Sequence, residues 1–305
     1  MQRVLRKKHT DLLFSLFLLV LLAFSVTHMA VISEGVFSAL TLCARAIIPT
    51  LFPFLILTDL LLSVEGTEKI LSMISLPLAK LLHLSKQGGT VVLLGAVFGF
   101  PMGAKAVAHY YSEGRLSKEE SERLLLFCGN ASPFFLIGSV GIGMLSSLKA
   151  GITIYGIQLG VSFICGLILG LFSKNTGKMD KNAPFHQKKI SFSHTVQGAV
   201  RQVLFISGYV VFFSAILSFT LPYIKSPFLS RLLASCLEIG NACSLASESG
   251  KYALPFCAFS ACFSGLSVYF QTLDCIEGSD LSTKSYLPIK LICGALGFYI
   301  ALFVG

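Results

Sequence analysis

The chain has 305 residues, of which 54% are hydrophobic and only 13% are charged. A soluble domain carries about 25% charged residues, so this composition excludes an ordinary soluble protein and indicates an integral membrane protein. The net charge of +9 comes from basic residues scattered between apolar segments. Such scatter is typical of cytoplasmic loops and excludes the folded basic patch that a nucleic-acid-binding protein needs.

Hydropathy predicts ten apolar segments, most of them near the roughly 20 residues that a membrane helix needs. The first follows a basic head and lacks a cleavage site of small residues, so we expect it to remain as an uncleaved span. The sequence therefore predicts an all-α polytopic membrane protein with about ten transmembrane segments. In chain order they cover residues 11–33, 36–63, 69–85, 89–111, 122–147, 151–173, 195–222, 228–248, 252–273 and 285–304.

Two of these segments are weak. Residues 68–84 are short and contain Pro77, and residues 228–247 are polar in their second half. Each of them can also be interpreted as a re-entrant hairpin. If both are hairpins, the chain has eight crossings plus two hairpins. Lysine and arginine favour cytoplasmic loops, and they gather before residue 9 and between residues 174 and 192. Both stretches lie inside only if 68–84 is a span, so charge favours ten crossings and a cytoplasmic N-terminus.

The two halves of the chain show a weak internal repeat. Residues 44–63 parallel residues 199–218, and residues 98–118 parallel residues 263–284, where both stretches continue into Glu-Gly, Leu-Ser and a lysine. With ten crossings the repeats enter the membrane from opposite sides, whereas with eight they are parallel. We divide the chain into an N-terminal anchor (1–35), a first repeat (36–149), a linker span with a basic cytoplasmic loop (150–194) and a second repeat (195–305).

Four clusters of polar residues, glycine and proline interrupt the apolar segments, two in each half. Unpaired backbone is costly in hydrocarbon, so such breaks must face protein or a wet cavity, where they can bind a solute or an ion. The alternative to a solute-binding role for these clusters is close helix packing through small residues. For Lys105 the alternatives are extension of the ammonium to the membrane interface (snorkelling) or a pair with Glu238. The candidate substrate-binding residues are Gly99, Pro101, Gly103 and Lys105; Asn130, Ser132 and Pro133; Glu238 and Asn241; and Ser264, Gly265, Ser267 and Gln271.

Glu238 is the strongest single candidate, because a charged group at the bilayer centre costs roughly 2.5–3.5 kcal/mol on the insertion scale. The nine cysteines have no C-x-x-C pair and no histidine at metal-ligand spacing, so we expect buried thiols without disulfides or a metal site. No G-x-S-x-G, H-E-x-x-H or P-loop motif occurs. We therefore expect no enzyme activity and no cofactor.

Four stretches of the sequence resemble bacterial sporulation integral membrane proteins of the YlbJ type, whose membrane core belongs to the nucleoside recognition (Gate) domain class. They are PTLFPFLIL (49–57), GFPMGAKAVAHYYSEGRLSKEESERLLLFCGNASPFFLIGSVGIGML (99–145), LEIGNA (237–242) and SGLSVYFQ (264–271). The resemblance covers most of residues 36–304. Where that family usually has Gly-Tyr-Pro-x-Gly, this chain has phenylalanine at position 100, so the tyrosine hydroxyl is lost.

The resemblance implies a spore-forming bacterium, an inner-membrane location and a role in making the spore cortex. It also implies a permease, because Gate domains form the permeation region of transport proteins. The expected function is transport of a nucleoside-like solute or an ion through a midplane site in the lipid bilayer. The alternative is a non-transporting scaffold with sporulation membrane proteins or a second copy as partners. An enzyme acting on a lipid-linked precursor is the least supported interpretation.

Overall fold

The computed structural model describes residues 15–16, 19–20, 22–23, 25–173 and 191–304, and within these ranges the chain forms helices and no strands. The predicted all-α fold is thus confirmed. The basic N-terminal head, the first residues of the first predicted span and the basic loop lie outside the described residues. Five helices in the described part are long and apolar enough to cross a membrane. They are Met29–Ile47, Leu148–Leu171, Phe192–Tyr223, Gly250–Cys275 and Tyr286–Val304. Ten crossings are not confirmed.

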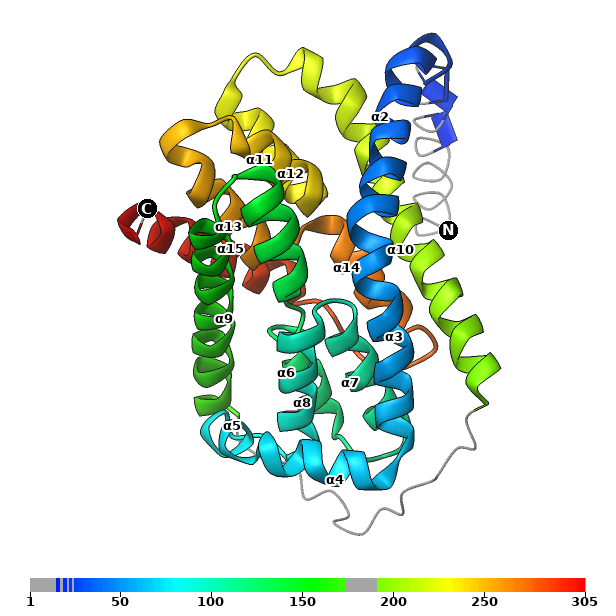
Figure 1. The fold of residues 1–305 in the computed structure, drawn as a ribbon, viewed down its shortest axis with the longest axis vertical. Coiled ribbons are helices and arrows are strands. Elements are labelled where there is room, and N and C mark those ends of the chain that lie inside the picture. Colours follow the sequence, from blue (N-terminus) through cyan, green and yellow to red (C-terminus); the bar gives the residue numbers. More distant parts are fainter. Residues whose placement is uncertain (1–14, 17–18, 21, 24, 174–190, 305) are drawn as a thin grey trace, which may run out of the picture.

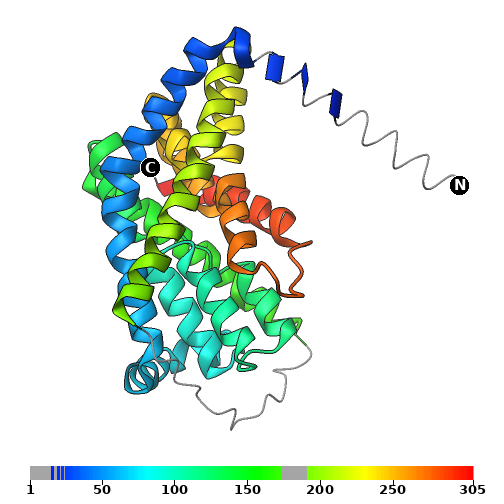
Figure 2. The same ribbon diagram turned by 90° about the vertical axis from the view of Figure 1, so that its right-hand side faces the viewer.

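Two long helical rods pack side by side along the molecule (Figures 1 and 2). The first is continuous through α2 (Met29–Leu42), a π-helical turn η1 (Cys43–Ile47) and α3 (Ile48–Ser63). The second is α10 (Phe192–Thr220), which ends in a 3-10 turn η3 (Leu221–Tyr223).

The boundary predicted near residues 34–35 is wrong, because the turn lies at His28. Gly35 does not end a helix; instead it lets α10 approach, since an added Cβ would lie 2.4 Å from Ser218 Oγ.

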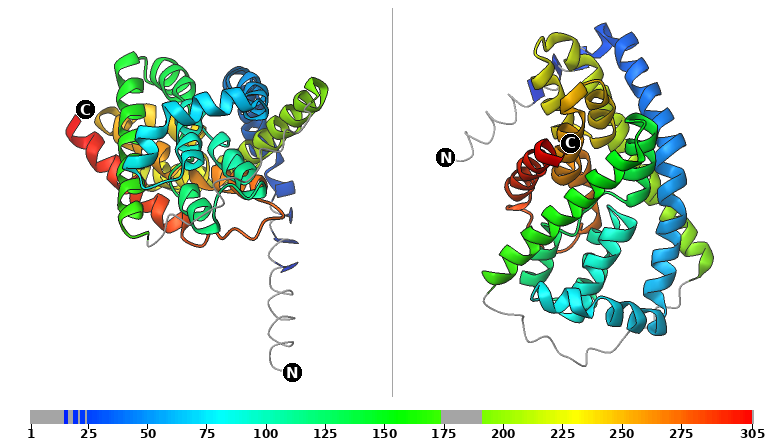
Figure 3. Two further views of the ribbon diagram at one scale, coloured as in Figure 1. Left: turned by 90° about the horizontal axis from the view of Figure 1, so that it is seen from below. Right: turned by 60° about the vertical axis from the view of Figure 1, so that its left-hand side comes forward.

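The predicted crossing at 69–85 is wrong. This stretch forms two short helices, α4 (Glu65–Ile74) and α5 (Leu76–Leu81), separated by a turn at Ser75. A ten-residue helix is about 15 Å long, half the thickness of the hydrocarbon core. Figure 3 shows these helices lying across the lower face of the molecule, the face at the bottom of Figure 1. Glu68 of α4 is buried there in an ion pair with Arg115.

The predicted crossing at 89–111 is a helical hairpin instead. α6 (Lys86–Phe98) and α7 (Met102–Ser112) pack against each other and reverse direction at Gly99–Pro101 (Figure 1). Gly99 has φ +79° and ψ −172°, a conformation that glycine alone adopts readily. Hydropathy counted one crossing here because both arms of the hairpin are apolar.

After this hairpin the chain forms a helix that is broken in its middle. α8 (Lys118–Leu125) leads through an unwound segment, residues 126–133, into the π-helix η2 (Phe134–Met144). Ser117 caps the N-terminus of α8, since its Oγ accepts a hydrogen bond from Glu120 N over 3.2 Å. The apolar helix α9 (Leu148–Leu171) completes this half of the molecule.

The second half also contains two short packed helices, a broken helix and an uninterrupted apolar helix. α11 (Pro227–Leu237) and α12 (Ile239–Ser247) pack against each other with one residue between them, which fits the hairpin interpretation of this weak segment. A 3-10 turn η4 (Gly250–Tyr252) then leads into a second broken helix, α13 (Ala253–Phe263) and α14 (Gly265–Cys275). An uninterrupted helix, α15 (Tyr286–Val304), follows and packs on α13.

Candidate functional site

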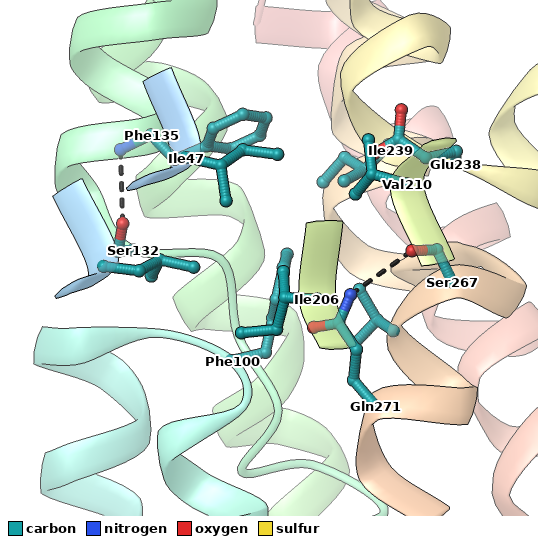
Figure 4. A pocket seen from close by; sticks show the side chains of 12 residues that line it. Ile47, Phe100, Ser132, Phe135, Ile206, Val210, Glu238, Ile239, Ser267 and Gln271 are labelled. Atoms are coloured by element: carbon teal, nitrogen blue, oxygen red, sulfur yellow. Dashed lines mark hydrogen bonds between the residues drawn. The ribbon is translucent and has the colours of Figure 1, made fainter. Parts of the chain in front are cut away.

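One small cavity lies where the hairpins and broken helices of both halves meet (Figure 4). It encloses about 30 Å³, enough for one or two waters. Its wall is mostly apolar and includes both long rods, through Ile47 and Leu51 on one and Ile206 and Val210 on the other. The remaining lining residues are Phe100, Ser132, Phe135, Glu238, Ile239, Ser267, Val268 and Gln271.

Gln271 supplies the polar group most available to a solute. Its Nε2 donates to Ser267 Oγ over 3.2 Å, one turn earlier on α14. Its Oε1 is buried and has no hydrogen-bond partner among the described residues. Figure 4 shows this oxygen directed away from Ser267 and toward the side where Phe100 lies. A buried acceptor without a donor is unfavourable by about 1–3 kcal/mol, so this oxygen is suited to a solute N–H or O–H.

Glu238 lines the cavity but uses its carboxylate to cap α12. Its two oxygens accept hydrogen bonds from Gly240 N (2.8 Å), Asn241 N (2.7 Å) and Asn241 Nδ2 (2.8 Å). The N-terminus of a helix stabilises such a negative charge. No lysine or arginine of the described residues forms an ion pair with it. The insertion cost noted above is therefore offset by amide donors, and Asn241 acts by holding Glu238.

The first hairpin tip is bonded to the first unwound segment. Phe100 N donates to Asn130 O over 2.6 Å. Gly99 lies so close that an added Cβ would be 2.5 Å from Ser132 N. Gly103 is also a packing position, because its Cβ would be 2.5 Å from the carbonyl oxygen of Cys128. This tip and the unwound segment are therefore packed together through their backbones.

The second half repeats this contact between a hairpin tip and a break. Ser264 ends α13 in the left-handed conformation with φ +74°. Gly265 follows with φ +76°, and an added Cβ there would lie 3.1 Å from Leu237 O at the second hairpin tip. Ser260 Oγ donates to Ser235 Oγ over 2.7 Å and ties α13 to α11.

Three side chains that the sequence did not single out hold the first break. Gln158 of α9 accepts from Ala131 N over 2.9 Å and donates to Ala131 O over 3.0 Å. Ser162 Oγ donates to Phe127 O over 2.5 Å. Lys290 of α15 donates to Gly129 O over 2.7 Å. A lone polar residue inside a long apolar helix was the available signal, since such residues seldom face lipid.

The structure brings four predicted residues to the cavity wall: Ser132, Glu238, Ser267 and Gln271. The other predicted residues do not line this cavity. Most of them lie at the hairpin tips and breaks, whereas Lys105 lies within α7. The expectation that Lys105 pairs with Glu238 is wrong. Lys105 Nζ lies 2.6 Å from Asp59 Oδ1 on α3, and both side chains are about one-quarter exposed. This pair joins the first hairpin to a long rod.

We expect Lys105→Ala and Asp59→Ala each to lower stability by only about 0.5–1 kcal/mol, because the pair is partly exposed. The double variant should lose little more than either single one. Thermal midpoints of the three variants and the wild type in detergent give the coupling energy through a double-mutant cycle. Fully additive losses would contradict a direct interaction.

A wider cavity of about 690 Å³ lies between α7 and the end of α14. Its wall includes Lys105, His109 and Cys275. At its edge Asp280 receives hydrogen bonds from Lys118 Nζ (2.7 Å) and Tyr111 Oη (2.5 Å). These two donors hold the pKa of Asp280 below its ordinary value. The contacts tie the connection between α14 and α15 to α7 and α8.

Within the described residues no three His, Cys, Asp or Glu side chains gather as metal ligands. All nine cysteines are free. The site therefore offers hydrogen bonds and apolar surface to whatever binds there.

These features define a class: an all-helical, multi-pass membrane protein in which paired hairpins and broken helices surround one central cavity. Comparison with known protein families finds no match, and no solved structure matches. The chain is 25% identical to the sporulation integral membrane protein YlbJ of Bacillus subtilis (strain 168), over 97% of this chain and 82% of that protein. This similarity supports an assignment to the YlbJ-type sporulation integral membrane proteins.

Proposed function

We propose that this protein is a permease that moves a small polar organic solute across a bacterial inner membrane during spore formation, without covalent chemistry. One observation carries the proposal: a single buried cavity is lined from both halves of the chain and contains the unpartnered Gln271 Oε1. Ligand sites are mostly apolar with a few placed polar groups, as this one is. A bare ion would instead need a full shell of oxygen ligands.

The direction of the helices supports an inverted repeat. α2 and α3 descend to the lower face, whereas α10 rises from it, so the two halves begin on opposite sides (Figure 1). Inverted repeats with discontinuous helices are typical of transporters whose site lies near the midplane. The Gate-domain assignment and a role in the cortex belong to the same proposal.

Charge supports a cytoplasmic lower face. Helices α4 and α5, the start of α6 and the connection between α7 and α8 carry Lys69, Lys80, Lys86, Arg115 and Lys118. The connections at the opposite face, with the helix turns beside them, carry Lys149, Lys225, Arg231 and Lys251. α9 ends and α10 begins at the lower face (Figure 1), and the lysines of the sequence between them favour the cytoplasm.

The cavity must enlarge during transport, because 30 Å³ is far below the 300–1,000 Å³ of typical ligand sites. The wider cavity between α7 and α14 lies on the route from the lower face, and both cavities share α14 as a wall. Separation of the two hairpins from the long rods would join them. Such a movement breaks Lys105–Asp59 at the first hairpin and the hydrogen bond from Asn241 Nδ2 to Ser214 Oγ at the second.

The test is uptake of radiolabelled solutes by liposomes that contain the purified full chain. The panel holds nucleosides, nucleobases, small carboxylates and inorganic ions. We expect saturable uptake of at least one organic solute, and we expect Gln271→Leu to lower it about tenfold, the effect of one lost buried hydrogen bond. Gln202→Leu is the matched control, since Gln202 lies on α10 outside the cavity wall.

The same variants separate transport from a scaffold role. In sporulating cells we expect Gln271→Leu to lower the yield of heat-resistant spores while the protein stays at its normal level in the membrane. Normal spores from Gln271→Leu, together with no uptake across the whole panel, would favour the non-transporting scaffold.

A further inference from the structure

Lys290 is a buried lysine with an unusual set of partners. Its side chain is 3% exposed, and its Nζ donates to the backbone carbonyl of Gly129. Among the described residues no carboxylate lies within ion-pair distance of this nitrogen. Lysines in membrane helices usually pair with an acid or extend to the interface. Lys290 does neither, because it points inward at the unwound segment.

The hydrogen bond of the Lys290 ammonium goes to a backbone carbonyl group and not to an acidic side chain. The ionisable groups that interact with it electrostatically are thiols and a phenol, those of Cys128, Cys165, Cys262, Cys293 and Tyr286. None of them is a carboxylate. Within hydrogen-bond and ion-pair distance, the acceptor that the ammonium contacts in the described residues is the Gly129 carbonyl oxygen.

That carbonyl belongs to the C-terminal side of a half-helix. α8 ends at Leu125, and the carbonyls of Phe127 and Gly129 follow its last turn. The C-terminal end of a helix carries partial negative charge, and in transporters with broken helices such carbonyl ends coordinate cations. Here Ser162 Oγ satisfies Phe127 O and the Lys290 ammonium satisfies Gly129 O.

We propose that the Lys290 ammonium is a resident cation of the first broken helix. It occupies the position at the carbonyl end where a metal cation would bind, and it fixes the backbone that leads to Ser132 in the cavity wall. The first break then holds its shape without bound Na⁺ or K⁺. This inference deepens the proposed function and rests on it, because the segment that Lys290 holds forms part of the solute cavity.

The proposal requires the charge and not only the length of the side chain. A lysine that merely fills space would be replaced without loss by methionine, which is similar in length and uncharged. A resident cation instead predicts chemical rescue: removal of the side chain creates a space that a small external cation can occupy.

The experiment compares Lys290→Ala, which leaves space, with Lys290→Met, which leaves none. The full-length variants and the wild type are purified in detergent, and their thermal midpoints are followed by reaction of the cysteines with a thiol-specific fluorophore. The buffers contain equal concentrations of NaCl, KCl, methylammonium chloride or N-methyl-D-glucamine chloride. No solute is added, so the outcome is independent of the uptake test.

We expect at least one small cation to raise the midpoint of Lys290→Ala by about 5 °C over N-methyl-D-glucamine, after subtraction of the wild-type change. Lys290→Met should shift by less than about 1 °C. Equal responses of the two variants would overturn the proposal. If Lys290→Ala yields no folded protein, Lys290→Arg and Lys290→Gln decide, because arginine keeps the charge and glutamine keeps only a donor. A midpoint for Lys290→Gln as high as that for Lys290→Arg would then refute the role of the charge.

Discussion

Replacement of Gly99 by alanine is expected to remove most of the folded protein from the membrane. An alanine Cβ would lie 2.5 Å from Ser132 N and 2.8 Å from Ser132 Cβ, inside a buried contact between the first hairpin tip and the unwound segment. The φ of +79° adds backbone strain for any L-residue. Strain and overpacking together are worth about 2–5 kcal/mol, a large part of the stability of a typical domain.

Gly114→Ala is the matched control, because Gly114 also has a positive φ (+68°) but an added Cβ there would meet nothing within 4 Å. It should lose only the backbone term, about 1–2 kcal/mol. The measurement is the yield of monodisperse protein extracted from membranes, followed by the thermal midpoint. If the two variants lost equal amounts, the contact of Gly99 with Ser132 would not be what holds the tip.

The sequence predicted the class of fold but not the path of the chain. Hydropathy sums apolar character over a window and carries no sign of direction, so the hairpin at Gly99 and a crossing have the same profile. Residues 69–85 were mistaken for a crossing for a related reason. The helix α4 has an apolar exposed side with Ile70 and Met73, and this raises the window average although the helix is short.

The candidate site was predicted in part because broken helices carry their own signal. Glycine, proline, serine and asparagine within apolar segments marked both hairpin tips and both breaks, and Ser132, Ser267 and Gln271 do reach one cavity. The pair of Lys105 with Asp59 was missed because Asp59 lies in another helix, and a single sequence does not show such a contact. Gln158 and Lys290 were missed because they lie in helices that are otherwise uninterrupted.

The structure also changes the physical role of the breaks. An unwound segment in a membrane exposes backbone donors and acceptors, which the sequence alone assigned to a solute. In the first break these groups are instead bonded to protein: Asn130 O to Phe100 N, Ala131 to Gln158 and Gly129 O to Lys290. The solute is therefore left with side chains, chiefly Gln271, and the breaks serve to let the hairpin tips approach the cavity.

Gln158→Leu is expected to destabilise the protein more than replacement of any other single side chain that forms a hydrogen bond to the backbone of the first break. Gln158 is 1% exposed and forms both hydrogen bonds to Ala131, which is itself fully buried. Leucine is similar in size but leaves the buried N–H and C=O of Ala131 without the partners that Gln158 supplies. At about 1–3 kcal/mol for each buried group, the loss is about 2–6 kcal/mol.

Ser162→Ala provides the control on the same helix, because Phe127 O keeps a second donor, Asn130 Nδ2 at 3.3 Å, when the serine is removed. This variant should lose only about 0.5–1.5 kcal/mol. Thermal midpoints and folded yield in one detergent rank the two. A Gln158→Leu protein as stable as Ser162→Ala would mean that the Ala131 backbone finds other partners, and the first break would then be held by the hairpin tip, Ser162 and Lys290 without help from Gln158.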